Sequence, residues 1–363
     1  MKRRTGTSPS RGGLTVSLII PAYNEQSVLR SKLENAVSIT CPQETLQIIV
    51  ASDGSSDETV VIAREFEDRG VKVLAFTERR GKASAVNDAV AAATGEIICL
   101  CDANVMFRPD ALQWLVAALD DSRVGAATGD VRLASPESNF GEGESLYYRI
   151  ERAIQLGESR IGSVMSVDGG MYVIRKELFR PLPPDTILDD FVTTMNVIRQ
   201  GKRVVYVPDA IATENGTPTA WAEFRRRMRV SAGAVQALKR GNRPRLFQTP
   251  IEFFQFISHK LLRWLGPVWL VLILVSSILL WNGGLIYRLA VGAQGLLYFS
   301  AIVATFSLRF RETRIGGITF YFVMSHVAMT VGLVKGLFNR QRVTWNRTER
   351  TAVSNEVKRA AAN

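Results

Sequence analysis

The sequence predicts an α/β domain with a mostly parallel sheet, followed by C-terminal transmembrane helices. Between residues 14 and 245, short apolar runs alternate with segments of helical periodicity, which is typical of a parallel sheet covered by helices on both faces. Polar clusters directly follow three of the apolar runs, where ligands bind in such sheets. From residue 261 to residue 338 the chain is dominated by apolar runs of 20 or more residues, about the length that a bilayer core requires.

The strands and helices of the α/β domain are predicted from these patterns in chain order. The expected strands are residues 15–20, 46–51, 71–76, 96–101, 124–127, 170–174 and 204–207. The expected helices are residues 25–38, 57–68, 82–93, 110–119, 144–158 and 190–199. Pro21 closes the first strand, and Ser55 or Ser56 is placed to cap the second helix.

The chain divides by composition into consecutive regions. They are a flexible N-terminus at residues 1–13, the α/β domain at 14–245, an interfacial helix at 246–260, about three transmembrane segments within 261–338, and a basic tail at 339–363. The expected spans are Leu261–Trp281, Leu285–Leu308 and Gly316–Phe338. Buried helices of a large soluble domain are a weak alternative for three such lengths in a row.

Charge is distributed unevenly along the chain. Lys and Arg number 45 against 34 Asp and Glu, for a formal net charge of +11. The basic patches are Lys2–Arg4, Arg225–Arg245, Arg309–Arg314 and the tail after Asn339. Three of these patches flank apolar segments, as is typical of contact with anionic membrane lipid. The sequence has no basic groove with aromatic platforms, so we expect membrane lipid and no nucleic acid as a partner.

The expected location is the inner cell membrane, as a multi-pass protein with a cytoplasmic α/β domain. The first apolar run, Val16–Ile20, is too short for the core of a signal peptide. Three cysteines without paired spacing suit a reducing compartment. The basic loop Arg309–Arg314 is expected in the cytoplasm. Three spans then place the basic tail outside, so either one segment is re-entrant or interfacial or the tail is an exception.

Three polar clusters follow predicted strands and are the candidate site. Pro21–Glu25 follows the first strand, Ser52–Asp57 the second, and Asp102–Asn104 the fourth. Because ligands of open α/β sheets bind outside the carboxyl ends of the strands, these clusters are expected to meet in one cleft. Turn-forming residues explain any one cluster alone, but they do not explain three at corresponding positions.

The residue types in these clusters suit a nucleotide diphosphate. Asp53 can accept a hydrogen bond from a base, and Tyr23 offers a flat face to it. Asp102 and Asn104 present two oxygen atoms for Mg²⁺ or Mn²⁺, and such a metal neutralises charge on a departing diphosphate. Lys82 opens a helix whose free backbone N–H groups favour anions.

These motifs together resemble a known enzyme family. The runs PAYNE, SDGSSD, RGKASAVNDAV and CDANVMFRPDAL are similar to family 2 glycosyltransferases of the GT-A fold, which include bacterial synthases of cellulose, poly-N-acetylglucosamine and hyaluronan. The likeness continues through VDGGMYVIRKELF, LDDFVTTMNVIRQGKRVVYVPDA and EFRRRMRVSAG, and so covers nearly the whole chain. It implies an inverting transfer of a hexose or N-acetylhexosamine from a nucleotide diphosphate donor, a UDP-sugar, to a saccharide or lipid-linked saccharide acceptor.

The resemblance also implies roles for particular residues. The implied donor-binding residues are Pro21, Tyr23, Glu25, Asp53, Lys82, Asp102, Arg226 and Arg229, with Asp102 and Asn104 as metal ligands. Leu188-Asp189-Asp190 matches the family's Thr-Glu-Asp, which makes Asp190 the catalytic base with Asp189 beside it. Capping of the helix that they open is the alternative role for these two carboxylates, and the two roles are compatible.

Two departures from the family pattern affect these expectations. The metal motif ends in the neutral Asn104 where the family has Asp, so we expect weaker metal binding. The stretch Arg226–Val230 lacks the Gln and Trp of the family's Gln-x-x-Arg-Trp, which argues against processive synthesis. Some arginines of Arg225–Arg229 are also suited to rest on anionic lipid. The alternative functions are a polyprenyl-phosphate or diacylglycerol glycosyltransferase, and a catalytically inactive membrane scaffold or transport component.

Overall fold

An eight-stranded sheet forms the centre of the molecule. The computed structural model describes residues 14–40, 46–133, 141–215 and 219–341. The strand order is β3-β2-β1-β4-β7-β6-β8-β5. The strands are β1 (Val16–Ala22), β2 (Leu46–Asp53), β3 (Val71–Phe76), β4 (Ile97–Leu100), β5 (Met106–Phe107), β6 (Val124–Leu133), β7 (Tyr172–Arg175) and β8 (Arg203–Glu214).

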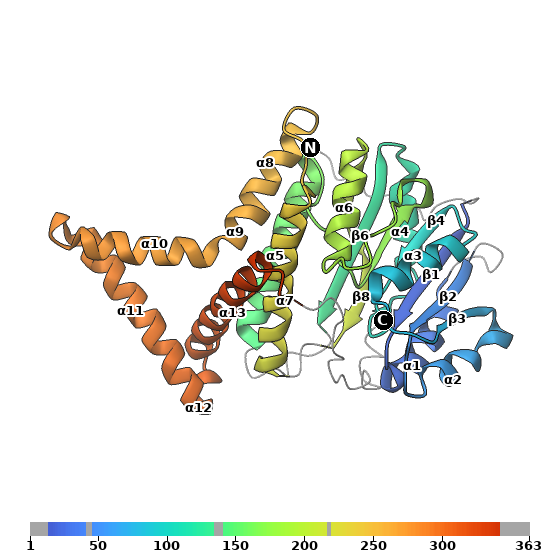
Figure 1. The fold of residues 1–363 in the computed structure, drawn as a ribbon, viewed down its shortest axis with the longest axis horizontal. Helices are drawn as coiled ribbons and strands as arrows, with labels where there is room; N and C mark the ends of the chain where they lie inside the picture. The colour runs from blue at the N-terminus through green and yellow to red at the C-terminus, as the bar shows by residue number, and fades with distance from the viewer. Residues whose placement is uncertain (1–13, 41–45, 134–140, 216–218, 342–363) are drawn as a thin grey trace.

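Helices cover the sheet and continue beyond it (Figure 1). Those of the α/β domain are α1 (Gln26–Val37), α2 (Thr59–Arg64), α3 (Lys82–Ala92), α4 (Ala111–Ala117), α5 (Gly141–Ile161), α6 (Asp189–Arg199) and α7 (Ala220–Lys239). They are followed by α8 (Pro250–Gln255), a π-helical segment η5 (Phe256–Leu261), α9 (Leu262–Trp264), α10 (Gly266–Leu279), α11 (Leu285–Phe306), α12 (Leu308–Arg311) and α13 (Arg314–Leu337).

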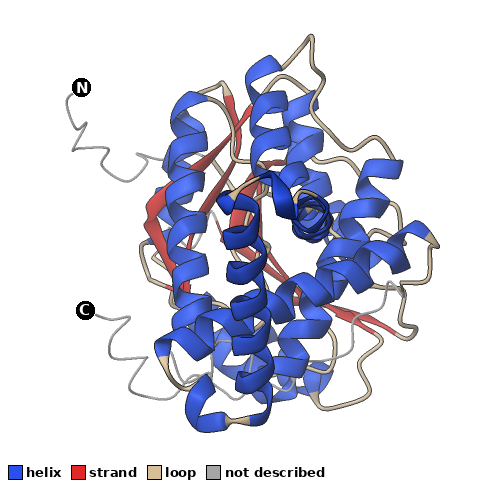
Figure 2. Ribbon diagram, turned by 90° about the vertical axis from the view of Figure 1, so that its left-hand side faces the viewer, coloured by secondary structure: helices blue, strands red, loops and turns tan. Residues whose placement is uncertain are grey.

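Two buried clusters lie on the two faces of the sheet. One contains Leu29 and Leu33 of α1 and Leu112 of α4, packed against residues of β1 and β2. The other contains Val86 of α3, Phe191 of α6 and residues of α7 and η5. Viewed from the side of α10 and α11, several helices stand in front of the strands (Figure 2). The α/β fold with its mostly parallel sheet is therefore confirmed.

The direction of β7 decides which loops reach the site. Pairs β1–β2, β2–β3, β1–β4 and β6–β8 are parallel, whereas β4–β7, β6–β7 and β5–β8 are antiparallel. Leu100 at the end of β4 pairs with Tyr172 at the start of β7. The loop that precedes β7 therefore lies at the carboxyl end of β4, beside the residues that follow Leu100.

Some elements differ from the sequence-based predictions. The predicted helix at 57–68 is divided into α2 and a 3₁₀ turn at Glu67–Arg69, which ends at Gly70 with a left-handed φ of 84°. Strands β6 and β8 extend several residues beyond the apolar runs at 124–127 and 204–207. Residues of the two extensions pair with each other, such as Asp130 with Ile211 and Arg132 with Thr213.

The membrane region contains, among the described residues, two helices that are long and apolar enough to span a bilayer, α11 and α13. The first predicted span, Leu261–Trp281, is not one straight helix. Pro250–Trp264 and Gly266–Leu279 meet at an angle of 66° and count as a third span only if the bent pair crosses together. Pro267 lies at this break, where a residue without a backbone N–H disfavours a continuous helix.

Helix α13 packs closely against α7 through small residues. A Cβ atom at Gly332 would lie 2.3 Å from the backbone oxygen of Met228, and one at Gly336 would lie 2.8 Å from the Cβ atom of Val235. At the end of α13, Lys239 of α7 donates hydrogen bonds from Nζ to the backbone oxygens of Gly336 at 3.1 Å and Leu337 at 2.7 Å. The absence of side chains at these glycines permits the close approach.

We predict that Gly332→Leu lowers the thermal unfolding midpoint of the detergent-solubilised protein. The new side chain has no space against α7, and overpacking of this kind typically costs about 1–3 kcal/mol. Gly292→Leu on α11 is the matched control, because nothing lies within 4 Å of a Cβ atom there. Equal midpoints for the two variants would contradict the contact between α7 and α13.

Candidate active site

Lys82 is the centre of the candidate site. It begins α3, and its Nζ lies 2.9 Å from Asp102 Oδ1 and 3.2 Å from Asp189 Oδ2. Burial lowers the pKa of Lys82, but the carboxylates of Asp102 and Asp189 outweigh this effect and raise the pKa above its ordinary value. The lysine therefore stays charged, and it joins the residue that follows β4 to the start of α6.

Asp53 fixes the loop that leads into α3. Its Oδ1 accepts a hydrogen bond from the backbone N–H of Arg80, and its Oδ2 accepts one from Gly81, both at 2.8 Å. Gly81 has a φ of 96°, a left-handed conformation that favours glycine. A carboxylate oxygen can accept more than one hydrogen bond, so these contacts leave Asp53 chemically able to accept from a nucleotide base as well.

The cluster that follows β1 lies next to the loop that follows β2. Pro21 is within β1, in register with Ala51 of β2. The guanidinium carbon of Arg79 lies 3.7 Å from the centre of the Tyr23 ring, so an arginine covers the face that we expected for a base. The backbone N–H of Glu25 donates to Thr59 Oγ1 at 2.8 Å, which connects the start of α1 to α2.

Asp190 lies one residue beyond Asp189, and its carboxylate has a different environment. Asp190 Oδ1 accepts a hydrogen bond from the backbone N–H of Phe191 at 2.7 Å, whereas Asp189 pairs with Lys82. Burial and the neighbouring Asp189 raise the pKa of Asp190 to about 6, against the opposing positive charges of Lys82 and Arg229. A carboxylate with this pKa is ionised at neutral pH and is a stronger base than an ordinary one.

Asp168 is a residue of the site that the sequence reasoning did not select. It precedes β7, and its Oδ1 accepts a hydrogen bond from the backbone N–H of Gly170 at 2.9 Å. Burial, followed by the negative charges of Glu214, Asp102 and Asp190, raises its pKa to about 7. The available signal was its place in VDGGMYVIRKELF, but only the antiparallel direction of β7 brings it to the site.

Asp102 and Asn104 are placed to offer oxygen ligands. The Asp102 side chain is 39% exposed and Asn104 Nδ2 lies 3.4 Å from Glu214 Oε2, its hydrogen-bond acceptor. Within the described ranges, no group of three His, Cys, Asp or Glu side chains is arranged to hold a metal ion. This donor set fits an oxygen-preferring cation whose remaining ligands come from a bound substrate or water.

The two predicted arginines of α7 have different surroundings. Arg229 is close enough for its charge to lower the pKa of Asp190. Arg226 is instead paired with Glu223, donating from Nε at 2.6 Å and from a terminal nitrogen at 3.0 Å. The buried Glu223 also accepts from Arg227 Nε at 2.8 Å and from the Tyr321 hydroxyl of α13 at 3.2 Å. Arg226 therefore takes part in the contact between α7 and α13, and its role in donor binding stays a prediction.

The fold and this arrangement of acidic residues are typical of glycosyltransferase domains that use nucleotide sugars. The similarity to known proteins supports the same class. Residues 17–182 match the family described as Glycosyl transferase family 2. The chain therefore contains a glycosyl transferase family 2 domain, and its sheet has the GT-A fold.

Two of the similar proteins are bacterial. The probable glycosyltransferase YdaM of Bacillus subtilis is 28% identical over 231 residues, 60% of this chain and 54% of that protein. The poly-β-1,6-N-acetyl-D-glucosamine synthase of Staphylococcus epidermidis RP62A is 23% identical over 299 residues, 80% of this chain and 71% of that protein. The alignment with YdaM thus spans about half of that relative's length.

One solved structure is similar over most of its length. The mannosyltransferase PcManGT from Pyrobaculum calidifontis, in complex with GDP-Man and Mn²⁺, has a TM-score of 0.67 and 22% sequence identity, and 92% of each chain is covered. This similarity establishes the shared fold.

We predict that Asp168→Asn stabilises the metal-free protein, and increasingly so as pH rises. Because the folded-state pKa is raised from 3.8 to about 7, ionisation of Asp168 opposes folding across this pH range. The wild type should lose thermal stability relative to the variant between about pH 4 and pH 7. Asp209→Asn, at an exposed position of β8, is the control. A stability difference between Asp168→Asn and wild type that is independent of pH would contradict this reading.

Proposed function

We propose that the protein transfers a sugar from a nucleotide diphosphate donor, a UDP-sugar, to a saccharide or lipid-linked saccharide at the membrane, with inversion at the anomeric carbon. The observation that carries this proposal is the placement of Asp190 beside the Asp102–Lys82–Asp189 ion pairs. A base with a raised pKa then adjoins a cation and an oxygen-rich metal site. Attack on a sugar donor needs these groups together, because a proton is removed at one end while charge develops at the other.

In this mechanism Asp190 accepts the proton of the acceptor hydroxyl as that hydroxyl attacks the anomeric carbon. Asp53 accepts a hydrogen bond from the donor base, and the charges of Lys82 and Arg229 attract the diphosphate. Asp102 and Asn104 would hold Mg²⁺ or Mn²⁺, which when bound neutralises the leaving diphosphate. Support for the metal includes the Mn²⁺ named in the complex of the similar mannosyltransferase.

We also place the reaction at the cytoplasmic face of the inner membrane. Helices α11 and α13 support attachment to a bilayer, and the basic segment Arg309–Arg314 lies between them, which favours a cytoplasmic loop. The similarity to poly-β-1,6-N-acetyl-D-glucosamine synthase supports a saccharide acceptor. The chain lacks the Trp and Gln of the processive motif at Arg226–Val230, so transfer of a single sugar is the expected outcome.

Asp190→Asn is expected to reduce turnover by about 10²–10⁴-fold, the usual contribution of a positioned base. Donor affinity should change little, because Asp53 and Lys82 are intact. In the wild type, turnover should fall as pH drops below about 6, since protonated Asp190 cannot accept a proton. The measurements are UDP release, UDP affinity and the pH dependence of kcat in nanodiscs.

Asp189→Asn is the matched variant for this experiment. It should cost less turnover, because Lys82 keeps its contact with Asp102. Wild-type turnover in Asp190→Asn with loss in Asp189→Asn would reverse the assignment of the base. Activity in both variants would indicate a phosphate acceptor such as a polyprenyl phosphate, which needs no base.

Metal dependence should act through Asp102. Asp102→Ala removes an oxygen ligand and is expected to abolish nearly all turnover, whereas Asn104→Asp should keep activity and bind Mn²⁺ more tightly because it adds a negative charge. Mn²⁺ is added in steps, and the rate of donor hydrolysis and the protein fluorescence are recorded at each concentration. Rates that stay unchanged in excess EDTA would refute the metal assignment.

A further inference from the structure

The segment from Pro250 to Trp264 connects the α/β domain to α10 and contacts the domain along one side (Figure 1). The outward side chains of Ile251, Phe254 and Leu262 are exposed, whereas Phe256 and Trp264 are buried. The π-helical turns of η5 begin at Phe256 and alter the regular spacing of faces along the segment. The segment contacts α6 through its aromatic residues and α5 through His259.

The aromatic residues of this segment pack against Phe191, the residue that follows the proposed base Asp190. The Phe191 ring lies 5.3 Å from the Trp264 ring in an edge-to-face arrangement and 6.3 Å from the Phe256 ring, centre to centre. Phe191 also donates the backbone hydrogen bond that Asp190 Oδ1 accepts. The packing that fixes the Phe191 ring therefore also fixes its backbone N–H, which orients the Asp190 carboxylate.

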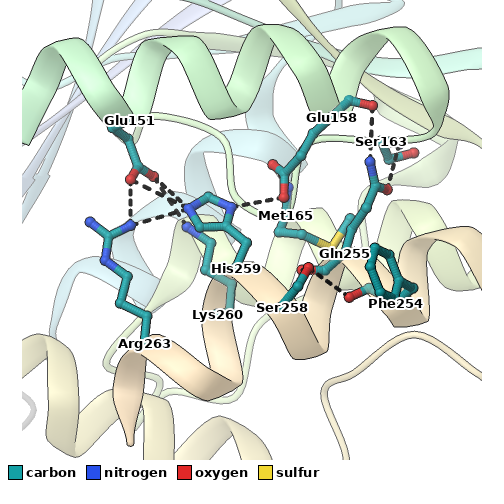
Figure 3. A network of polar contacts seen from close by, with 10 residues as sticks. All are labelled: Glu151, Glu158, Ser163, Met165, Phe254, Gln255, Ser258, His259, Lys260 and Arg263. Carbon is teal, nitrogen blue, oxygen red and sulfur yellow. Dashed lines mark hydrogen bonds and ion pairs between the residues drawn. The ribbon is translucent and has the colours of Figure 1, made fainter. Parts of the chain in front are cut away.

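Polar contacts hold the same segment against the end of α5 (Figure 3). His259 Nδ1 lies 2.8 Å from Glu158 Oε1, and Gln255 Nε2 donates to the backbone oxygen of Glu158 at 3.1 Å. Gln255 Oε1 accepts from the backbone N–H of Ser163, and Glu158 Oε2 accepts from that of Met165. These contacts fix the beginning of the loop that leads to Asp168.

That loop also contacts the proposed base and its helix, α6. A Cβ atom at Gly169 would lie 3.7 Å from Asp190 Oδ2, which is ordinary van der Waals contact. Val167 N–H donates to Thr194 Oγ1, and Thr194 Oγ1 in turn donates to the backbone oxygen of Asp190. Asp190 is thus enclosed between Phe191, which the segment supports directly, and a loop whose start the segment also holds.

We propose that the segment Pro250–Trp264 positions Asp190 for catalysis, with Trp264 and Phe256 as positioning residues. The inference rests on the proposed role of Asp190 as the base. The segment that leads to the membrane then has two roles: it connects the domain to α10, and it holds the active site in place. A structural role alone would change stability without changing the turnover of the folded protein.

The test compares Trp264→Ala and Trp264→Phe with the wild type, using the full chain in nanodiscs. We expect Trp264→Ala to lower kcat by about 10- to 100-fold, as a small displacement of a catalytic group does, while KM for the donor stays unchanged. Trp264→Phe keeps an aromatic ring against Phe191 and should restore most of kcat. Trp281→Ala, which removes a half-exposed tryptophan beyond α10, is the control and should behave like wild type.

The pH dependence of kcat gives a second readout. Loss of packing behind Asp190 admits water, so the acidic limb of the profile should move to lower pH in Trp264→Ala. The charged groups that face Asp190 are Asp189, Lys82, Arg229 and Asp168, and none of them is altered in this variant.

An unchanged kcat and an unchanged acidic limb in Trp264→Ala would overturn the inference. If that variant does not yield folded protein, the same criteria apply to Trp264→Leu, which keeps apolar volume but removes the ring. Asp190→Asn is measured in parallel. Its loss of turnover beside a fully active Trp264→Ala would refute positioning and leave the proposed function intact, whereas a fully active Asp190→Asn would refute the base and the positioning together.

Discussion

The contact of Lys82 with Asp102 and Asp189 holds the two halves of the site together. Asp102 follows β4 and Asp189 begins α6, and these elements are almost 90 residues apart in the chain. Both carboxylates lie within 3.2 Å of Lys82 Nζ, and two negative charges held this close to one cation would repel each other without it. The lysine therefore makes an acidic cleft compatible with folding, and the same charge is available to an anionic substrate.

The site holds more carboxylates than Lys82 can neutralise, and burial together with their mutual repulsion raises the pKa of two of them. Burial and neighbouring carboxylates raise the pKa of Asp168 to about 7 and that of Asp190 to about 6. Raised pKa values of this kind cluster at functional sites because chemistry needs groups that titrate near neutral pH. A bound metal or a positively charged transition state would reverse the balance and favour the ionised forms.

Helix α7 connects the candidate site to the apolar C-terminal helices. Arg229 acts electrostatically on Asp190, while Glu223, with its pKa lowered to about 2 by Arg226 and Arg227 against the cost of burial, contacts Tyr321 of α13. The helix that contributes a cation to the site is thus packed along its length against a helix long enough to span a bilayer. Together with Pro250–Trp264, it connects the apolar C-terminal helices to the α/β domain at separate places.

The sequence by itself determined seven of the eight strands, the apolar helices and the residues that follow β1, β2 and β4, because periodicity and the ends of parallel strands are local properties of the chain. It predicted site roles for Asp53 and Asp102 from their places after strands, for Lys82 from its place at the start of a helix, and for Asp190 by resemblance. Only the tertiary structure decided that β7 runs antiparallel, which brings Asp168 to the site, and that Arg226 pairs with Glu223. It also placed Trp264 behind Phe191 and bent the first apolar segment at Leu265. These features depend on contacts between residues distant in the chain, which spacing alone does not encode.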